Sequence, residues 1–223
     1  MAINITRPVA PIASSANVTS YATASFTPTA NAFLVVLVFA TATTATGSVM
    51  GFGLNWYKYN SGAISGSTLY IFWAKTGASV SADVVTFDCT GDAATGCFIV
   101  VHEATGDDQF TRIPIRQSVF NAASSTNANG TFASALDTNN GYIAAYAGGL
   151  TAGVSTVPTG WTQSSDGDIS NPTANFFSAR RSTGESGSTV TFTNPSTGWL
   201  FVGVEIYADG LGPRPALAAL GCG

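Results

Sequence analysis

The segment Gly96-Cys97-Phe98-Ile99-Val100-Val101-His102-Glu103 decides the fold class, because its pattern recurs 102 residues later as Gly198-Trp199-Leu200-Phe201-Val202-Gly203-Val204-Glu205. Each copy is an apolar run of strand length that starts after a turn residue and ends at a glutamate. Short apolar runs bounded by Gly, Asn, Asp and Ser are typical of β-strands. A run of this kind that occurs twice predicts an internally duplicated β-protein.

Three further landmarks occur in the same order in both copies. The matches are Asn31–Val36 with Asn140–Ala145 at an offset of 109, Asn55-Trp56 with Gly160-Trp161 at 105, and Val85–Phe87 with Val190–Phe192 at 105. The offset changes between strands, where loops tolerate insertions best. We therefore expect two repeat halves, about 17–106 and 130–210, joined by a connector over 107–129.

The runs predict an all-β protein. In the first half we expect strands near 18–26, 32–40, 52–59, 68–75, 83–88 and 97–103, and in the second near 130–136, 141–147, 160–164, 175–181, 188–193 and 199–207. A half of ~80 residues presents one apolar sheet face that needs a partner. Two halves packed face to face would give one pseudo-symmetric antiparallel β-sandwich over 17–210. Leu69–Trp73 is apolar on both faces, so we expect its outer face to be covered, by an arm or a neighbouring subunit. The alternative is an exposed aromatic patch, which would mark a binding site.

The regions outside the two halves have irregular patterns. Residues 1–16 are expected to form an N-terminal arm and 211–223 a C-terminal tail, while the connector carries a short strand near Arg112–Val119 without a catalytic pattern. The start of the chain has no basic region followed by an apolar one, which argues against a signal peptide. The strongest apolar run, Ala32–Ala40, is far shorter than the ~20 residues of a membrane helix. We expect a soluble protein made in a cytoplasm, with no membrane partner.

Composition limits the partners. Only 9% of the residues are charged, against roughly a quarter in typical soluble domains, and the mean hydropathy is +0.26. Such a surface suits extracellular and virion β-proteins, or surfaces buried in an assembly. The net charge of -4 argues against nucleic acid, because phosphate binding needs clustered Lys and Arg. The adjacent Arg180 and Arg181 are expected simply to end a strand.

Candidate catalytic residues are few. His102 is the sole histidine and is followed by Glu103, but adjacent strand residues point to opposite faces and cannot work as a pair. Glu103 and Glu205 occupy equivalent positions of the repeat. They could approach each other as the paired carboxylates of a glycosidase, or each could be a structural carboxylate bonded to a turn. The second explanation is favoured, so we name no catalytic and no cofactor-binding residue.

Metal and disulfide signals are weak. Asp166-Gly167-Asp168 and Asp107-Asp108 offer oxygen ligands that suit calcium, but without the spacing of a calcium loop, and turn chemistry is the favoured explanation. We therefore expect no metal. Cys89 and Cys97 flank a seven-residue loop and could form a cross-strand disulfide. A protein made in a cytoplasm would carry them as thiols until it meets an oxidant, and Cys222 in the tail is expected to stay free.

The repeated units resemble the doubled, jelly-roll-like β-sandwich domains of tailed-bacteriophage structural proteins. The segments that carry the resemblance are Val157–Thr162, Asn175–Arg181, Ser188–Thr193 and Trp199–Asp209; the first half departs from the pattern at Asn55-Trp56. The resemblance implies a non-enzymatic virion protein, most similar to a capsid decoration or cement protein. It further implies a homo-oligomer, with a trimer favoured, that binds the major capsid protein or other virion proteins on the capsid surface. Met1–Ser15 would be the chief anchor.

Two other functions remain open. A glycan-binding module of a tail fibre or adhesin would stack sugars on aromatic side chains. Its candidate residues are Trp56, Tyr57, Tyr59 and Trp161. A jelly-roll glycan hydrolase would use Glu103 and Glu205.

Overall fold

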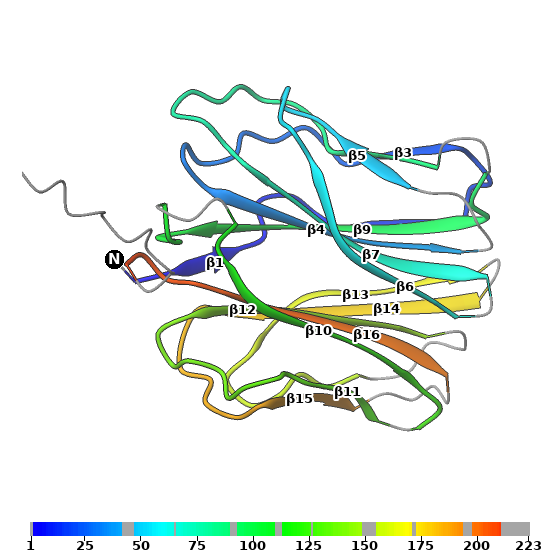
Figure 1. Cartoon of the computed structure of the whole chain (residues 1–223). Coiled ribbons are helices and arrows are strands. Elements are labelled where there is room, and N and C mark those ends of the chain that lie inside the picture. The colour runs from blue at the N-terminus through cyan, green and yellow to red at the C-terminus, as the bar shows by residue number, and fades with distance from the viewer. Residues whose placement is uncertain are drawn as a thin grey trace, which may run out of the picture.

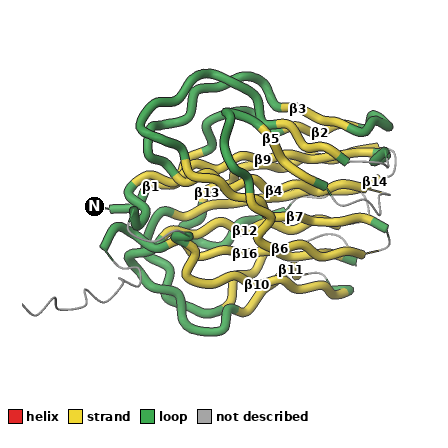
Figure 2. Tube along the Cα trace, turned by 45° about the horizontal axis from the view of Figure 1, so that its top comes forward, coloured by secondary structure: helices red, strands yellow, loops and turns green. Residues whose placement is uncertain are grey.

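The computed structural model describes residues 2–41, 47–64, 66–89, 93–109, 113–125, 127–148, 155–170, 173–193 and 198–210. Within these ranges the chain forms strands, turns and loops and no helix, as Figure 2 shows. All strand pairs are antiparallel. The predicted all-β, antiparallel fold class is therefore confirmed.

The part of the chain that the structure describes contains sixteen strands, and here the first half also takes in residues 4–14 and the second half the connector strand. The first half contains β1 (Asn4–Thr6), β2 (Ile12–Ser14), β3 (Ser20–Ala22), β4 (Phe33–Thr41), β5 (Ser48–Met50), β6 (Tyr57–Ile64), β7 (Ser67–Lys75), β8 (Thr86–Asp88) and β9 (Gly96–Thr105). The second contains β10 (Ile115–Ala123), β11 (Asn127–Thr131), β12 (Gly141–Gly148), β13 (Thr162–Ser170), β14 (Thr173–Arg181), β15 (Thr189–Thr193) and β16 (Trp199–Ile206).

The strands form four stacked layers (Figure 1). The first layer is the small sheet β3-β8-β5, and it covers the large sheet β1-β9-β4-β7-β6, in which β2 also pairs with β9. The third layer is the large sheet β10-β16-β12-β14-β13, and the fourth is the small sheet β11-β15. In each half the chain alternates between its large and its small sheet in the same order. In the second half Thr156, which bridges to Thr193, takes the place that β5 has in the first. Each half is thus a jelly-roll-like sandwich in its own right.

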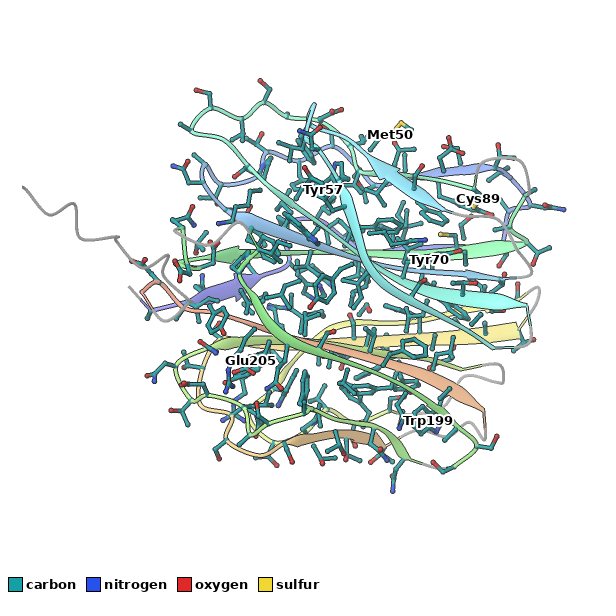
Figure 3. The ribbon with its side chains drawn as sticks, viewed as in Figure 1. Met50, Tyr57, Tyr70, Cys89, Trp199 and Glu205 are labelled. Atoms are coloured by element: carbon teal, nitrogen blue, oxygen red, sulfur yellow. The ribbon has the colours of Figure 1, made fainter. Side chains whose placement is uncertain are left out.

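Three apolar cores separate the four layers. The central core lies between the large sheets and contains Val35 and Val100 from the first half with Ile143 and Val202 from the second. The two outer cores lie between each large sheet and its small sheet. Figure 3 shows Tyr70 and Cys89 in one outer core and Trp199 in the other. The outer face of β7 is therefore covered by the chain's own small sheet, and not by the arm or neighbouring subunit that we expected.

The large sheets face each other with approximate twofold symmetry. Strand β6 packs on β10 and β16, and its counterpart β13 packs on β2 and β9. Both β6 and β13 contain a bulge, between Lys58 and Asn60 and between Gln163 and Ser165, at the same offset of 105. Beyond the ends of β9 and β16, Asp107 pairs with Ala208, which joins the equivalent ends of the two halves. The structure thus resembles a dimer whose two subunits share one chain.

Residues 2–15 do not form a separate arm. Strands β1 and β2 both pair with β9 at the edge of the first large sheet, and Ile3 and Ile5 are buried in the central core. The pattern failed to predict these strands because each has three residues, too few for apolar alternation to show. The predicted connector strand is confirmed as β10, which pairs with β16 as β1 and β2 pair with β9. The tail over 211–223 lies outside the described residues.

One predicted match between the halves is displaced by a residue. Val35 and Leu37 of β4 face the central core, as do Ile143 and Ala145 of β12, so the true offset here is 108 and not 109. The expected pairing of Phe33 with Tyr142 would match a residue of the central core with one of an outer core. A shift of one residue turns every side chain of a strand to the other face. The offsets of 105 and 102 agree with the faces that the side chains occupy.

Candidate functional site

His102 lies in the central core, on the face of β9 that also carries Val100 and Ala104. It is fully buried, and neither ring nitrogen has a hydrogen-bond partner among the described residues. Burial, together with the positive charges of Arg180 and Arg7, lowers the pKa of His102 to about 3. The ring is therefore neutral at physiological pH, and no described carboxylate is bonded to it. This environment lacks the acid that would orient a catalytic histidine.

The two arginines near His102 join the N-terminal segment to the second half. Arg180 donates from Nε to the Ile5 carbonyl oxygen at 3.0 Å and from Nη1 to Ser164 Oγ at 2.9 Å. Arg7 donates to the Ser164 carbonyl oxygen. The Ser182 hydroxyl accepts the Ile5 N–H at 3.0 Å. This polar group closes one side of the central core and holds β1 against β14.

Glu103 and Glu205 point away from the central core, each toward the outer core of its own half. Thr29 donates to Glu103 from its backbone N–H and from its hydroxyl, both at 2.7 Å. Glu205, drawn in Figure 3, accepts the Asp137 N–H at 2.9 Å and the Asn140 amide at 2.8 Å. In both halves the carboxylate therefore holds the loop through which the chain returns from the small sheet to the large one.

The two glutamates consequently do not form a glycosidase pair. Both large sheets and the central core lie between the outer core that Glu103 faces and the one that Glu205 faces. Two partners of Glu205 were not identified from the sequence: Arg116, at 2.9 Å from the carboxylate, and Gln117, at 2.6 Å. Both residues lie on the predicted connector strand. That strand was the signal that could have identified them, because β10 lies beside β16 in the sheet.

Asp107 lies where the two halves meet and is completely buried. Its carboxylate is 3.5 Å from Lys75 Nζ and accepts a hydrogen bond from Gln109 Nε2 at 2.8 Å. Burial raises the pKa of Asp107 to about 6, although the charge of Lys75 acts in the opposite direction. The Asp108 backbone N–H donates to the Tyr207 carbonyl oxygen at 3.1 Å. These aspartates belong to the junction of the halves.

The Asp166–Asp168 segment was expected to form a turn, and this expectation is wrong. It lies within the nine-residue strand β13, which pairs with β14 along its length. The sequence suggested a turn because Asp and Gly are favoured in turns. Strand β13 is an edge strand, so one of its sides pairs with no other strand in the described chain and its polar residues are tolerated.

The aromatic residues considered for glycan binding do not form a common platform. Trp161 is 6% exposed and donates from Nε1 to Glu185 at 2.8 Å, Trp56 is half-buried, and Tyr59 packs against the central core. Tyr57 is 40% exposed, and its ring stacks on Trp73 with the centroids 4.6 Å apart. Only this ring of the four offers a substantial exposed face.

Cys89 and Cys97 are both buried thiols in the first outer core and are not joined by a disulfide. Burial raises the pKa of Cys97 well above its usual range, and Cys89 adds to the shift. A thiol with a raised pKa is a poor nucleophile, so Cys97 behaves as a core residue. Cys222 lies outside the described residues.

The described residues include no helix that could cross a membrane and no group of three or more His, Cys, Asp or Glu side chains arranged to hold a metal. Arg180 and Arg181 end β14, as expected. Comparison of the chain with protein families, with curated proteins and with solved structures finds no match.

Proposed function

We propose that this chain is a virion structural protein, of the type that decorates a bacteriophage capsid. The observation that carries the proposal is the use of its rare charged groups. Glu103, Glu205, Asp107 and Arg180 all hold loops, strands or the two halves in place. A rigid, duplicated jelly-roll body with a charge-poor exterior suits a component whose role is to contact other subunits.

The fold of the N-terminal segment changes our expectation of which residues would make such contacts. The chain has an accessible surface of 9492 Å², close to the about 9,500 Å² expected for a compact monomer of its mass. Residues 2–15 belong to the first large sheet and the central core, so they cannot serve as the free anchor that we expected of Met1–Ser15. Contacts with the major capsid protein, or between copies in a trimer, would use the exterior of the completed fold.

The proposal is tested on particles. Antibodies raised against the purified protein are applied to density-banded phage particles from the source that encodes the chain. We expect the protein in the fractions that contain intact heads, and light scattering of the purified protein should give the mass of a homo-oligomer, with a trimer favoured. Detection only in particle-free fractions would overturn the virion assignment.

Glycan binding is the second candidate, and one observation favours it. Tyr57 presents an exposed ring that Trp73 holds in place by stacking, and a rigid aromatic face of this kind can stack on a sugar. The test is a glycan array with the wild-type protein and with Tyr57→Ala. Binding that Tyr57→Ala abolishes supports this function, and an array without a signal excludes its tested sugars as ligands.

A further inference from the structure

Strand β13 carries two carboxylates on one face. Asp166 and Asp168 are two residues apart, so both point to the outer side of the second large sheet, and both are exposed. Their neighbours in β14 are Phe177 and Asn175, respectively. Within the described chain neither carboxylate forms an ion pair with Lys or Arg. Like charges that share one face of a sheet destabilise it, so the fold gains nothing from placing two acids here.

Asn175 brings a buried and incompletely bonded amide to this pair. It is 1% exposed, and its Nδ2 donates to Asp168 Oδ1 at 3.0 Å. Its Oδ1 has no hydrogen-bond partner among the described residues. A buried carbonyl oxygen without a donor is costly and rare in native proteins. Asn175 thus lies against Asp168 with an unsatisfied acceptor.

A tyrosine lies on the same side of the sheet as the two acids. Tyr146 of β12 lies beside Phe177 in the sheet, and its hydroxyl bonds to Ser155 Oγ. Phe177 is in turn the strand partner of Asp166, so Tyr146 lies two strands away from the acids on the same side of the sheet.

The fold itself does not require the two acids. The offset of 105 that relates the bulges of β6 and β13 matches Asp166 with Ser61 and Asp168 with Ala63. The first half builds the same edge strand without any charge at these two positions. The second half has therefore acquired a feature that strand pairing does not explain.

We propose that Asp166, Asp168 and Asn175 bind a calcium ion on the outer side of β13. In the structure Nδ2 faces Asp168, and a half-turn of the Asn175 carboxamide exchanges Nδ2 and Oδ1. The carbonyl oxygen then lies next to Asp168 Oδ1, and Nδ2 takes the position that Oδ1 has now. The 3.0 Å between the present atom pair suits two oxygen ligands that are each about 2.4 Å from one calcium ion. Both aspartates are exposed, so water completes the coordination.

The chemistry favours calcium over magnesium. Calcium accepts irregular sets of carboxylate, carbonyl and water oxygens, whereas magnesium demands a tight octahedron and keeps its own water. Three protein side chains on an exposed strand resemble a weak extracellular site, with a dissociation constant on the order of 10⁻⁴ to 10⁻³ M.

The test is thermal unfolding of the full chain in EDTA, in 10 mM CaCl₂ and in 10 mM MgCl₂. We expect calcium to raise the Tm by about 5 °C and magnesium to raise it clearly less. Asp166→Ser and Asp168→Ala introduce the residues of the first half, and both should abolish the calcium response. Asp88→Asn removes a negative charge from β8, in the opposite outer layer, and should preserve that response.

The variants also separate loss of binding from loss of folding. In EDTA, Asp166→Ser should melt at the wild-type temperature or above, because it removes the repulsion between the two acids. Terbium luminescence sensitised by the nearby Tyr146 reports binding directly, and calcium should displace the terbium. The proposal is overturned if calcium leaves the wild-type Tm unchanged, if magnesium acts equally, or if the response and the luminescence persist in both variants.

Discussion

Replacing His102 with valine should make the protein more resistant to acid. The equivalent position of the second half is Val204, so the fold accepts valine in this environment. His102 is buried without hydrogen bonds, and its pKa is lowered from 6.5 to about 3. Between these two values the unfolded chain binds a proton that the folded chain does not. The stability that a neutral His102 permits is therefore complete above pH 6.5 and is lost as the pH falls toward 3.

The size of the effect follows from the pKa difference. Each pH unit below 6.5 lowers the free energy of unfolding by about 1.4 kcal/mol, so at pH 5 the histidine destabilises the wild-type protein by about 2 kcal/mol. Asp107 acts in the opposite direction, because its pKa is raised to about 6 and its protonation stabilises the folded state as the pH falls from 6 to 3.8. That contribution is present in both proteins and cancels in their difference.

The assay is urea unfolding of the wild type, His102→Val and the control Val100→Ala at several pH values between 7.5 and 5. Val100 lies on the same face of β9, and its replacement leaves a cavity but no titrating group. We expect the free energy of unfolding of His102→Val to rise relative to that of the wild type by about 2 kcal/mol between pH 7 and pH 5. The difference in free energy of unfolding between Val100→Ala and the wild type should stay constant. A difference for His102→Val that does not change with pH would refute the claim that a neutral imidazole is buried without partners.

Three further pairs of substitutions test the packing. Glu205→Gln should lower the free energy of unfolding by about 2–3 kcal/mol in urea titrations, because it breaks the ion pair between the buried Glu205 carboxylate and the partly exposed Arg116. Glu103→Gln should cost only about 1 kcal/mol, and equal effects would contradict this reasoning. Ile5→Ala should lower the free energy of unfolding by about 2–5 kcal/mol in the same assay, because Ile5 of β1 lies in the central core. Asn4 is exposed, so Asn4→Ala should lower it by less than about 0.5 kcal/mol. Gly62→Ala should destabilise the protein by about 1–3 kcal/mol and so lower the Tm measured by circular dichroism, because the new Cβ would lie 1.8 Å from Phe120 Cζ. In the control Gly198→Ala the new Cβ meets nothing within 4 Å, and the Tm should stay unchanged.

Much of the fold could be predicted because the buried strands carry their own signal. The apolar runs that became β4, β7, β9, β12 and β16 were recognised, and the repeat of Glu103 as Glu205 matches structurally equivalent residues. The sequence also favoured a structural role for the two glutamates. Each follows a strand residue that faces the central core, so the glutamate itself points to the other face of its sheet. Burial on both faces leaves a dense apolar run that needs no knowledge of the partner strand.

Apart from β10, the edge strands and the short strands were harder to predict. Asp166 and Asp168 suggested a turn, and only the pairing of β13 with β14 shows that they lie on a strand. Strands β1, β2 and β5 have three residues each, so their membership of a sheet depends on the hydrogen bonds of β9 and β8. For the candidate calcium site, the approach of Asn175 to Asp168 is likewise a contact between strands. A sequence pattern does not contain it.

The amino-acid sequence determined that the protein is a duplicated antiparallel β-structure, because periodic burial along each strand leaves its mark on the order of residues. The tertiary structure decided that each half is a complete sandwich, that the N-terminal segment completes a sheet, and that Glu103 and Glu205 face separate outer cores. These features depend on which face of a strand meets which neighbour. A shift of one residue reverses the faces, as the match of Phe33 with Tyr142 illustrates, and only the packed chain distinguishes the two registers.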